Sequence, residues 1–360
     1  MMSHYKRIKI KYSKKEKKEE PIVIIKPFNY GLAILKSMCA FLVIVTHQFN
    51  KDSTKNKLIL FITKQRTFHV PCFCMLSFNF MCNTLLSLNP KKIIIRIFRL
   101  LIPYIGWPLI IFSINRKLKN YINKKYVYTY DNLKQQYFWG RGVLGQFWFS
   151  WNLIVITIIF IVVIFIFRKH SLIALHILML LCYVSQYTGY HINKYKNLPT
   201  YKKMGALLIF EMIPFAVTGF TLGFYNIINT LQDMKIKTLI YSILIYNFVV
   251  DCNIFSDIKG MIFHGLHLNI KAVCVIFIFS LFPSDKITND YLQKFLIAVT
   301  NYSGGVYYLH MSMMRYFKEY INEFKKESFW AVVINYLMCY FICFIGTKTF
   351  GKTPLKYLFI

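Results

Sequence analysis

Apolar runs of about 20 residues recur along this 360-residue chain, and they constrain its fold more than any other feature. A helix of that length spans the hydrocarbon core of a bilayer, because each residue adds about 1.5 Å to its length. Hydrophobic residues make up 56% of the chain and the mean hydropathy is +0.43, more apolar than a soluble domain of this size. We therefore predict an all-α fold, a polytopic membrane helix bundle with about ten transmembrane helices.

The predicted spans form one membrane domain with a short tail at each end. Residues 1–28 form a basic tail that we predict to be disordered and cytosolic, because segments rich in Lys and Arg stay on the cytosolic side. Residues 29–346 form the membrane domain, and residues 347–360 form a short basic C-terminal tail. The predicted spans fall near residues 29–48, 69–88, 94–114, 147–167, 171–189, 205–226, 236–250, 260–283, 296–316 and 329–346.

The charge balance is strongly basic, with 45 Lys and Arg residues against 14 Asp and Glu residues and a formal net charge of +31. In a soluble protein, such an excess would favour nucleic-acid binding. Here the excess lies in loops and chain ends between apolar runs, where it contacts anionic lipid headgroups. We therefore expect membrane lipids as partners and no nucleic acid.

The nine cysteines are scattered through the apolar runs. Their odd number and irregular spacing predict no disulfide framework, and no CxxC pair occurs that would indicate a metal site. We expect them to act as small apolar side chains between helices, and we expect no metal.

The apolar run of residues 30–50 contains two strongly polar side chains, Lys36 and His47. Ionisable side chains are costly inside a membrane and are usually functional. At 100° per residue, the two side chains lie within about 20° of one helix face and roughly 16 Å apart along it. A cation and an imidazole placed in this way suit an extended substrate, and Ala40 and Val43 on the same stripe would line the passage between them. Alternatively, Lys36 extends to the lipid headgroups and His47 lies at the membrane interface.

Arg96 and Arg99 form an RxxR motif at the start of the third predicted span. Residues three apart on a helix are neighbours on one face. Two adjacent guanidinium groups suit phosphate oxygens, because each can donate two parallel hydrogen bonds. The alternative is a cytosolic anchor that contacts lipid headgroups.

Several segments resemble, in order, those of the acyltransferase-3 family of integral-membrane acyltransferases. The segment KSMCAFLVIVTHQF is similar to the family's first helix, in which Arg or Lys is followed after ten residues by His, as Lys36 is by His47. The further matching segments are VPCFCMLSFNF, RIFRLLIPYIGWPL, GQFWFSWNLIVI, PFAVTGFTLGF and NYSGGVYYLH. The resemblance extends from about residue 30 to about residue 346.

The resemblance implies a membrane-bound O-acyltransferase that moves an acyl group, expected to be acetyl, from acyl-CoA to a hydroxyl of a cell-surface carbohydrate or a similar acceptor. His47 matches the family's essential histidine, and an imidazole, with an unperturbed pKa near 6.5, suits a general base. Lys36, Arg96 and Arg99 would bind the phosphates of acyl-CoA. A plasma or inner membrane is expected, with the N-terminus in the cytosol.

The chain departs from the family pattern at two positions and leaves other polar residues to be assigned. Phe78, directly after Ser77, stands where the family usually has Gly, which would change close helix packing there. Gln146 stands where the family often has a histidine, two residues before Trp148, which we interpret as a packing or interface aromatic. His310 matches a family histidine, and we interpret it as a packed, hydrogen-bonded residue. Glu211 is a lone acid in an apolar run and needs a partner.

Two other functions fit the same polar residues. A secondary transporter or flippase would also use Lys and His inside the membrane, although the sequence shows no inverted repeat. An inactive family member is the second alternative, and it is disfavoured by the presence of Lys36, His47 and the RxxR motif.

Overall fold

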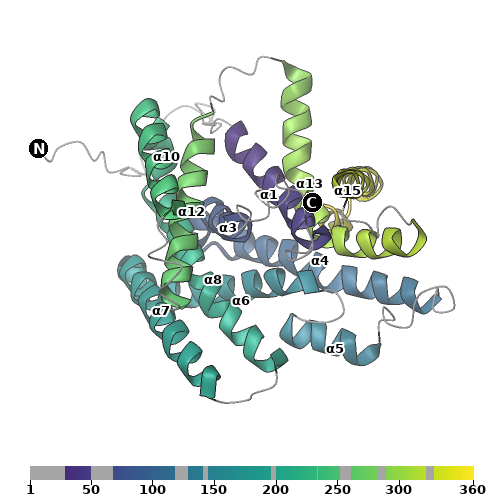
Figure 1. Cartoon of the computed structure of the whole chain (residues 1–360), viewed down its shortest axis with the longest axis horizontal. Coiled ribbons are helices and arrows are strands. Elements are labelled where there is room, and N and C mark those ends of the chain that lie inside the picture. The colour runs from purple at the N-terminus through teal and green to yellow at the C-terminus, as the bar shows by residue number, and fades with distance from the viewer. Residues whose placement is uncertain are drawn as a thin grey trace, which may run out of the picture.

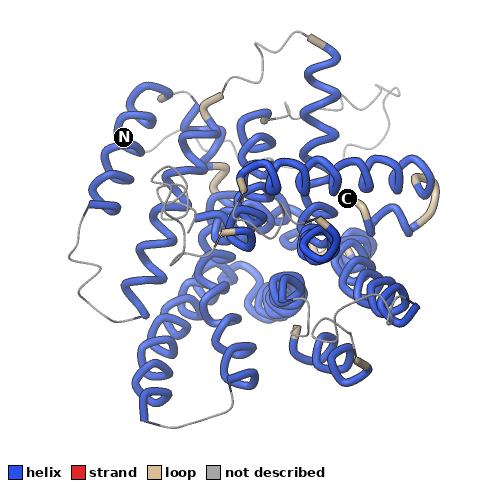
Figure 2. Tube along the Cα trace, turned by 45° about the vertical axis from the view of Figure 1, so that its right-hand side comes forward, coloured by secondary structure: helices blue, strands red, loops and turns tan. Residues whose placement is uncertain are grey.

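The computed structural model describes residues 29–49, 68–117, 129–140, 145–195, 200–232, 234–251, 261–282, 289–321 and 328–360. These ranges contain helices and no strand, as the tube in Figure 2 shows, so the all-α prediction is confirmed. The basic tail predicted for residues 1–28 lies outside the described ranges.

The longer helices follow the predicted spans closely. Each predicted span coincides with one helix to within six residues at either end. In chain order these helices are α1 (Tyr30–Gln48), α3 (His69–Leu86), α4 (Pro90–Lys117), α6 (Trp148–Phe167), α7 (Ser171–Tyr195), α8 (Thr200–Phe224), α10 (Lys235–Asp251), α12 (Met261–Ser280), α13 (Asp290–Tyr320) and α15 (Phe329–Phe350). The shorter elements are α5 (Tyr130–Trp139), α9 (Ile227–Gln232) and the 3₁₀ turns η3 (Gly145–Phe147), η4 (Arg168–His170) and η5 (Pro354–Leu358).

Within the described residues, 5 helical stretches are long and apolar enough to cross a membrane. They are Tyr30–Gln48, His69–Leu86, Pro90–Ile114, Trp148–Gln186 and Phe329–Phe350, and shorter apolar helices cover Leu208–Phe224 and Gly265–Ser280. These helices indicate a membrane protein, whereas the number of about ten spans stays a prediction.

Capping side chains define where several helices begin. The side chain of Asn29 accepts a hydrogen bond from the Leu32 amide at 3.0 Å and caps α1. Asn289 does the same for α13. These caps satisfy amide groups that have no partner within the helix.

The helix α1 lies in the middle of the bundle, in contact with α3, α12, α13 and α15 (Figure 1). The helix α3, which contacts α1, also packs along α8, whose Gly219 and Gly223 allow a close approach of the α3 and α8 backbones. A Cβ atom on Gly219 would collide with the backbone of Met75. Small residues at such contacts are typical of helices packed in membranes.

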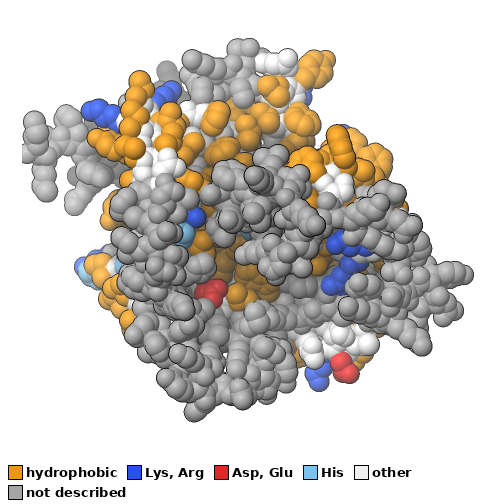
Figure 3. Space-filling model, viewed as in Figure 1, with side chains coloured by type: hydrophobic (Ala, Val, Ile, Leu, Met, Phe, Trp, Pro, Cys, Tyr) orange, Lys and Arg blue, Asp and Glu red, His pale blue; other side chains and the backbone are white. Residues whose placement is uncertain are grey.

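The outer faces of several helices expose large apolar side chains, and Figure 3 shows such side chains over the upper part of one face. Examples are Phe165 on α6, Ile173 on α7, Leu244 on α10 and Phe341 on α15. Soluble proteins rarely expose so much contiguous apolar surface. These faces therefore suit contact with lipid chains.

The cysteines behave as the sequence predicts. Eight are described, and all of them are buried and carry free thiols. The ninth, Cys252, lies outside the described residues.

Candidate active site

Four cationic side chains line one cavity of about 450 Å³, which we call the basic cavity. They come from three elements: Lys36 from α1, Arg96 and Arg99 from α4, and Lys356 from η5. Among its described lining residues there is no Asp or Glu. Because like charges repel and their burial is costly, such a concentration favours an anionic ligand that completes the cavity.

Lys36 is half-buried, and its position is fixed by the contact between α1 and α13. Its Nζ atom donates a hydrogen bond to the backbone carbonyl of Thr300 at 3.3 Å. An ammonium group has three donors. The hydrogen bond to Thr300 uses one of these three donors and holds the ammonium group against the α13 side of the cavity.

Arg96 is held against α3 by its own side-chain hydrogen bonds. Its Nη2 atom donates to the hydroxyl of Ser77, and its Nε atom lies 3.2 Å from the sulfur of Met81. Arg99, one turn further along α4, is exposed, and its guanidinium group lies 5.4 Å from the centre of the Tyr357 ring. The predicted RxxR pair thus faces one cavity, with Arg96 tethered and Arg99 resting on an aromatic ring.

The C-terminal residues, predicted from the sequence to be a basic tail, form a wall of this cavity. The indole nitrogen of Trp107 donates to the carbonyl of Leu358 at 2.8 Å, and Phe359 packs on the same indole ring. This packing brings Lys356 beside Arg99, and both cations contact the ring of Tyr357. The available signal was the apolar sequence around Lys356, which a solvated tail would not need.

His47 stacks on His310, and we call these two residues the imidazole pair. Their ring centres are 5.4 Å apart and the rings are inclined by 30°. His47 is exposed near the end of α1, whereas His310 on α13 is fully buried. Both residues are candidates from the sequence alone, but their contact could not be predicted from it.

The hydrogen bonding of His310 fixes its tautomer. Its Nδ1 atom lies 2.7 Å from the Tyr307 carbonyl, which can only accept, so Nδ1 carries the proton and donates. Its Nε2 atom is buried and has no hydrogen-bond partner in the described structure. The expectation of a packed, hydrogen-bonded histidine is met at Nδ1, while Nε2 remains an unused acceptor.

Tyr307 connects the imidazole pair to the basic cavity. Its ring lines the cavity and lies 5.8 Å from the ring of His310. Its hydroxyl donates to the carbonyl of Gln146 at 2.5 Å. Gln146 in turn donates to the carbonyl of Tyr308 at 3.1 Å, so this glutamine holds α13 in place.

The expected passage along α1 is filled by protein. Ala40 and Val43 are buried in the core, and neither is among the residues that line the basic cavity. The prediction that they line a passage is therefore wrong, because the neighbouring helices pack against that stripe. The space beside Lys36 instead extends to Tyr307 on α13.

The remaining candidates are not among the described residues that line the basic cavity. Trp148 packs edge-on against Phe149, as expected of a packing aromatic. Glu211 is half-buried on α8 and is not part of the basic cavity. Across the described ranges, no group of three or more His, Cys, Asp or Glu side chains could hold a metal ion.

Residues 29–348 match a family model described as an acyltransferase domain. Neither a curated protein nor a solved structure gives a significant match to the chain. The matched residues include Lys36, Arg96, Arg99 and the imidazole pair. Among the cations of the basic cavity, only Lys356 falls outside the match.

Proposed function

This chain belongs to the acyltransferase-3 family, and on that premise we propose that it is a membrane-bound O-acyltransferase. It would move an acyl group, acetyl in this proposal, from acyl-CoA to a hydroxyl of a cell-surface carbohydrate or a similar acceptor. The observation that carries this proposal is the basic cavity, because four convergent cations suit the phosphates of a CoA donor.

The donor would bind with its phosphates against Arg96, Arg99 and Lys356. The volume of about 450 Å³ lies within the range of small-molecule sites. The hydrogen bond from Arg96 to Ser77 holds the guanidinium group in place before the donor arrives, which lowers the entropic cost of binding. Arg99 is exposed, so the part of CoA that does not fit the cavity can extend outward past it.

The thioester end of the donor would lie toward Tyr307, whose ring lines the cavity and neighbours His310. Because Ala40 and Val43 are buried, we propose this route along α13 in place of a route along α1. His47 would then lie beyond His310 as seen from Tyr307. The thioester must therefore move from Tyr307 toward the imidazole pair before the acyl group is transferred.

In the proposed reaction, the oxygen of the acceptor hydroxyl attacks the thioester carbonyl carbon while His47 accepts the proton of that hydroxyl. The tetrahedral intermediate collapses, the carbon–sulfur bond breaks, and the CoA sulfur leaves with the proton returned by the imidazolium. The products are an ester and free CoA. The stacked ring of His310 would limit the rotation of His47 and so orient its nitrogen toward the acceptor.

We propose that the protein lies in a plasma or inner membrane with its N-terminus in the cytosol. The Lys36 end of α1 would then face the cytosol, where acyl-CoA is found, and His47 would lie further across the bilayer. The transporter alternative is disfavoured, because the family model that the chain matches is an acyltransferase domain.

The test is an acyl-transfer assay with the full chain reconstituted in liposomes, supplied with acetyl-labelled CoA and a panel of glycans. We expect label to appear as a base-labile ester on at least one glycan, with release of free CoA. Transport of a labelled solute without ester formation on any acceptor would contradict the proposal and support the alternative.

A further inference from the structure

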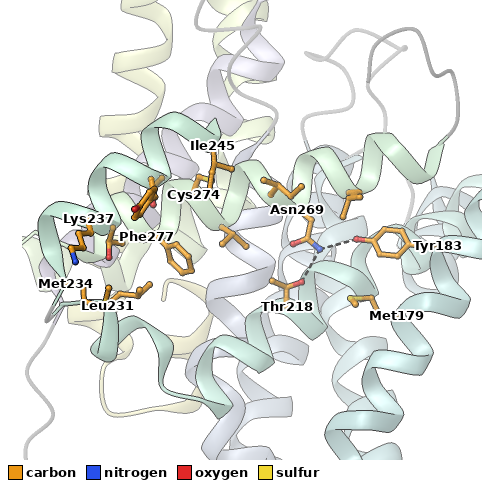
Figure 4. Close-up of a pocket in the computed structure, with 16 residues that line it drawn as sticks. Met179, Tyr183, Thr218, Leu231, Met234, Lys237, Ile245, Asn269, Cys274 and Phe277 are labelled. Atoms are coloured by element: carbon orange, nitrogen blue, oxygen red, sulfur yellow. Dashed lines mark hydrogen bonds between the residues drawn. The ribbon is translucent and has the colours of Figure 1, made fainter. Parts of the chain in front are cut away.

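A second cavity, of about 470 Å³, lies between α7, α8, α9, α10 and α12 (Figure 4). We call it the apolar cavity, because aliphatic and aromatic side chains such as Met179, Ile245 and Phe277 make up most of its wall. It shares no lining residue with the basic cavity. The proposed acyl transfer therefore makes no use of it.

The polar groups at one end of the apolar cavity are bonded to the protein. The amide nitrogen of Asn269 donates to the Thr218 hydroxyl at 3.0 Å and lies 3.2 Å from the Tyr183 hydroxyl. Figure 4 shows these three side chains converging at the end of the cavity near Met179. These bonds join α7, α8 and α12, so this end offers a ligand mainly apolar surface.

The opposite end carries a cation. Lys237, in the first turn of α10, lines the cavity there, next to Leu231 and Met234 (Figure 4). Lys237 is exposed, so its ammonium group lies at the mouth of the cavity. The cavity therefore combines one charged end with a long apolar interior, which matches a molecule with an anionic head and an aliphatic chain.

The surroundings of α10 indicate where that molecule comes from. The face of α10 turned away from the cavity exposes Ile236, Ile240 and Ile243 by 74%, 50% and 43%. In a membrane protein, such a face contacts lipid chains. A lipid that leaves the surrounding bilayer can therefore enter the cavity beside α10 without crossing water.

We propose that the apolar cavity binds one acyl chain of an anionic membrane phospholipid, whose headgroup phosphate contacts Lys237. In the cavity, the acyl chain of the lipid exchanges contacts with other lipids for contacts with the cavity wall. Burial of the acyl chain alone therefore gives the lipid little preference for the cavity over the bilayer. Selectivity comes from the net charge of the headgroup, because the choline cation of phosphatidylcholine offsets the phosphate charge that Lys237 attracts. A single Lys near a membrane surface favours a net negative charge by about fivefold in affinity.

The test uses native mass spectrometry of the full chain released from detergent micelles, with dioleoyl phosphatidylglycerol or dioleoyl phosphatidylcholine added stepwise. The wild type is expected to retain one phosphatidylglycerol molecule with about fivefold preference over phosphatidylcholine. Lys237→Gln should remove that preference. The matched control is Lys235→Gln, which makes the same charge change two residues earlier, at a position that does not line the cavity.

A second pair of variants tests the cavity itself. Ser242 is buried and lines the cavity, whereas Ile243 is exposed and does not. Ser242→Trp should fill the space and abolish retention of both lipids, whereas Ile243→Trp should behave as the wild type. Equal retention of the two lipids by the wild type, equal losses in Lys235→Gln and Lys237→Gln, or normal retention by Ser242→Trp would overturn the proposal. Lys237→Gln changes only an exposed side chain, so it provides the test even if Ser242→Trp fails to fold.

Discussion

The basic cavity and the imidazole pair are built in different ways, although α1 contributes to both. Three cations of the basic cavity are held by different elements: Lys36 by a carbonyl on α13, Arg96 by a hydroxyl on α3, and Arg99 by the ring of Tyr357 in η5. In the imidazole pair, His47 stacks on a buried His310, whose ring is held by a hydrogen bond to the Tyr307 carbonyl. The proposed donor binding is thus distributed over several elements, whereas the proposed proton transfer rests on one side chain.

This difference predicts two classes of variant. A change at the imidazole pair should affect the rate and leave donor affinity intact. A change at one cation should weaken donor affinity without abolishing it, because the other cations remain. The loss should be larger for a cation that is held firmly than for one that is exposed. The following predictions, from the largest expected effect to the smallest, test this division.

His47→Ala should have the largest effect. Loss of a general base lowers the rate by about 10²- to 10⁴-fold, and the affinity for a non-hydrolysable acetyl-CoA analogue should stay the same. The measurement is initial-rate acyl transfer in liposomes, with analogue titration of the same preparation. Thr46→Ala is the matched control, because the Thr46 hydroxyl donates to the Leu42 carbonyl of its own helix at 2.8 Å. Equal rates for the two variants would remove His47 from the reaction.

Arg96→Ala should weaken donor binding by about ten- to a hundredfold, because a charge-assisted hydrogen bond to phosphate is worth about 1.5–3 kcal/mol. The variant also leaves the Ser77 hydroxyl without the partner that it has in the wild type. Transfer from the saturated complex should continue near the normal rate. A normal affinity for the analogue would identify Arg96 as a structural residue.

Arg99→Ala should weaken donor binding less than Arg96→Ala, by about tenfold at most. Arg99 is exposed, so solvent weakens its attraction to phosphate. Raising the salt concentration should reduce the effect of Arg99→Ala more than that of Arg96→Ala. An effect of Arg99→Ala that exceeds that of Arg96→Ala at every salt concentration would reverse the assignment of the two arginines.

Tyr357→Leu should have the smallest effect on binding. The ring of Tyr357 supports Arg99 and Lys356, each at 5.4 Å, and exposed cation–π contacts are worth about 0.5–1 kcal/mol. Affinity for the analogue should therefore fall by about two- to fivefold per contact, with an unchanged rate at saturation. An unchanged affinity would show that the C-terminal residues close the cavity without orienting its cations.

The helices could be predicted from the sequence because the bilayer imposes their length and polarity on each segment separately. The pairing of Lys36 with His47 on one face is also local, since it depends only on helix geometry. Contacts between distant segments could not be predicted in this way. The stacking of His47 on His310, and the return of Lys356 to the side of Arg99, depend on how the helices pack.

The error at Ala40 and Val43 has the same origin. Their position on the stripe of Lys36 follows from helix geometry, but a stripe of small side chains also permits close packing of a neighbouring helix. Both side chains are buried in the core. Helix periodicity predicts which residues share a face, whereas the partner helices decide whether that face lines a cavity.

The most direct test of the division between binding and reaction measures both quantities on His47→Ala and Arg96→Ala in the same nanodisc preparation. The quantities are the dissociation constant of the acetyl-CoA analogue and the single-turnover transfer rate at saturating acetyl-CoA. We predict that His47→Ala loses the rate and keeps the affinity, and that Arg96→Ala loses the affinity and keeps the rate. Parallel loss of both quantities in both variants, or full transfer by His47→Ala, would contradict the account.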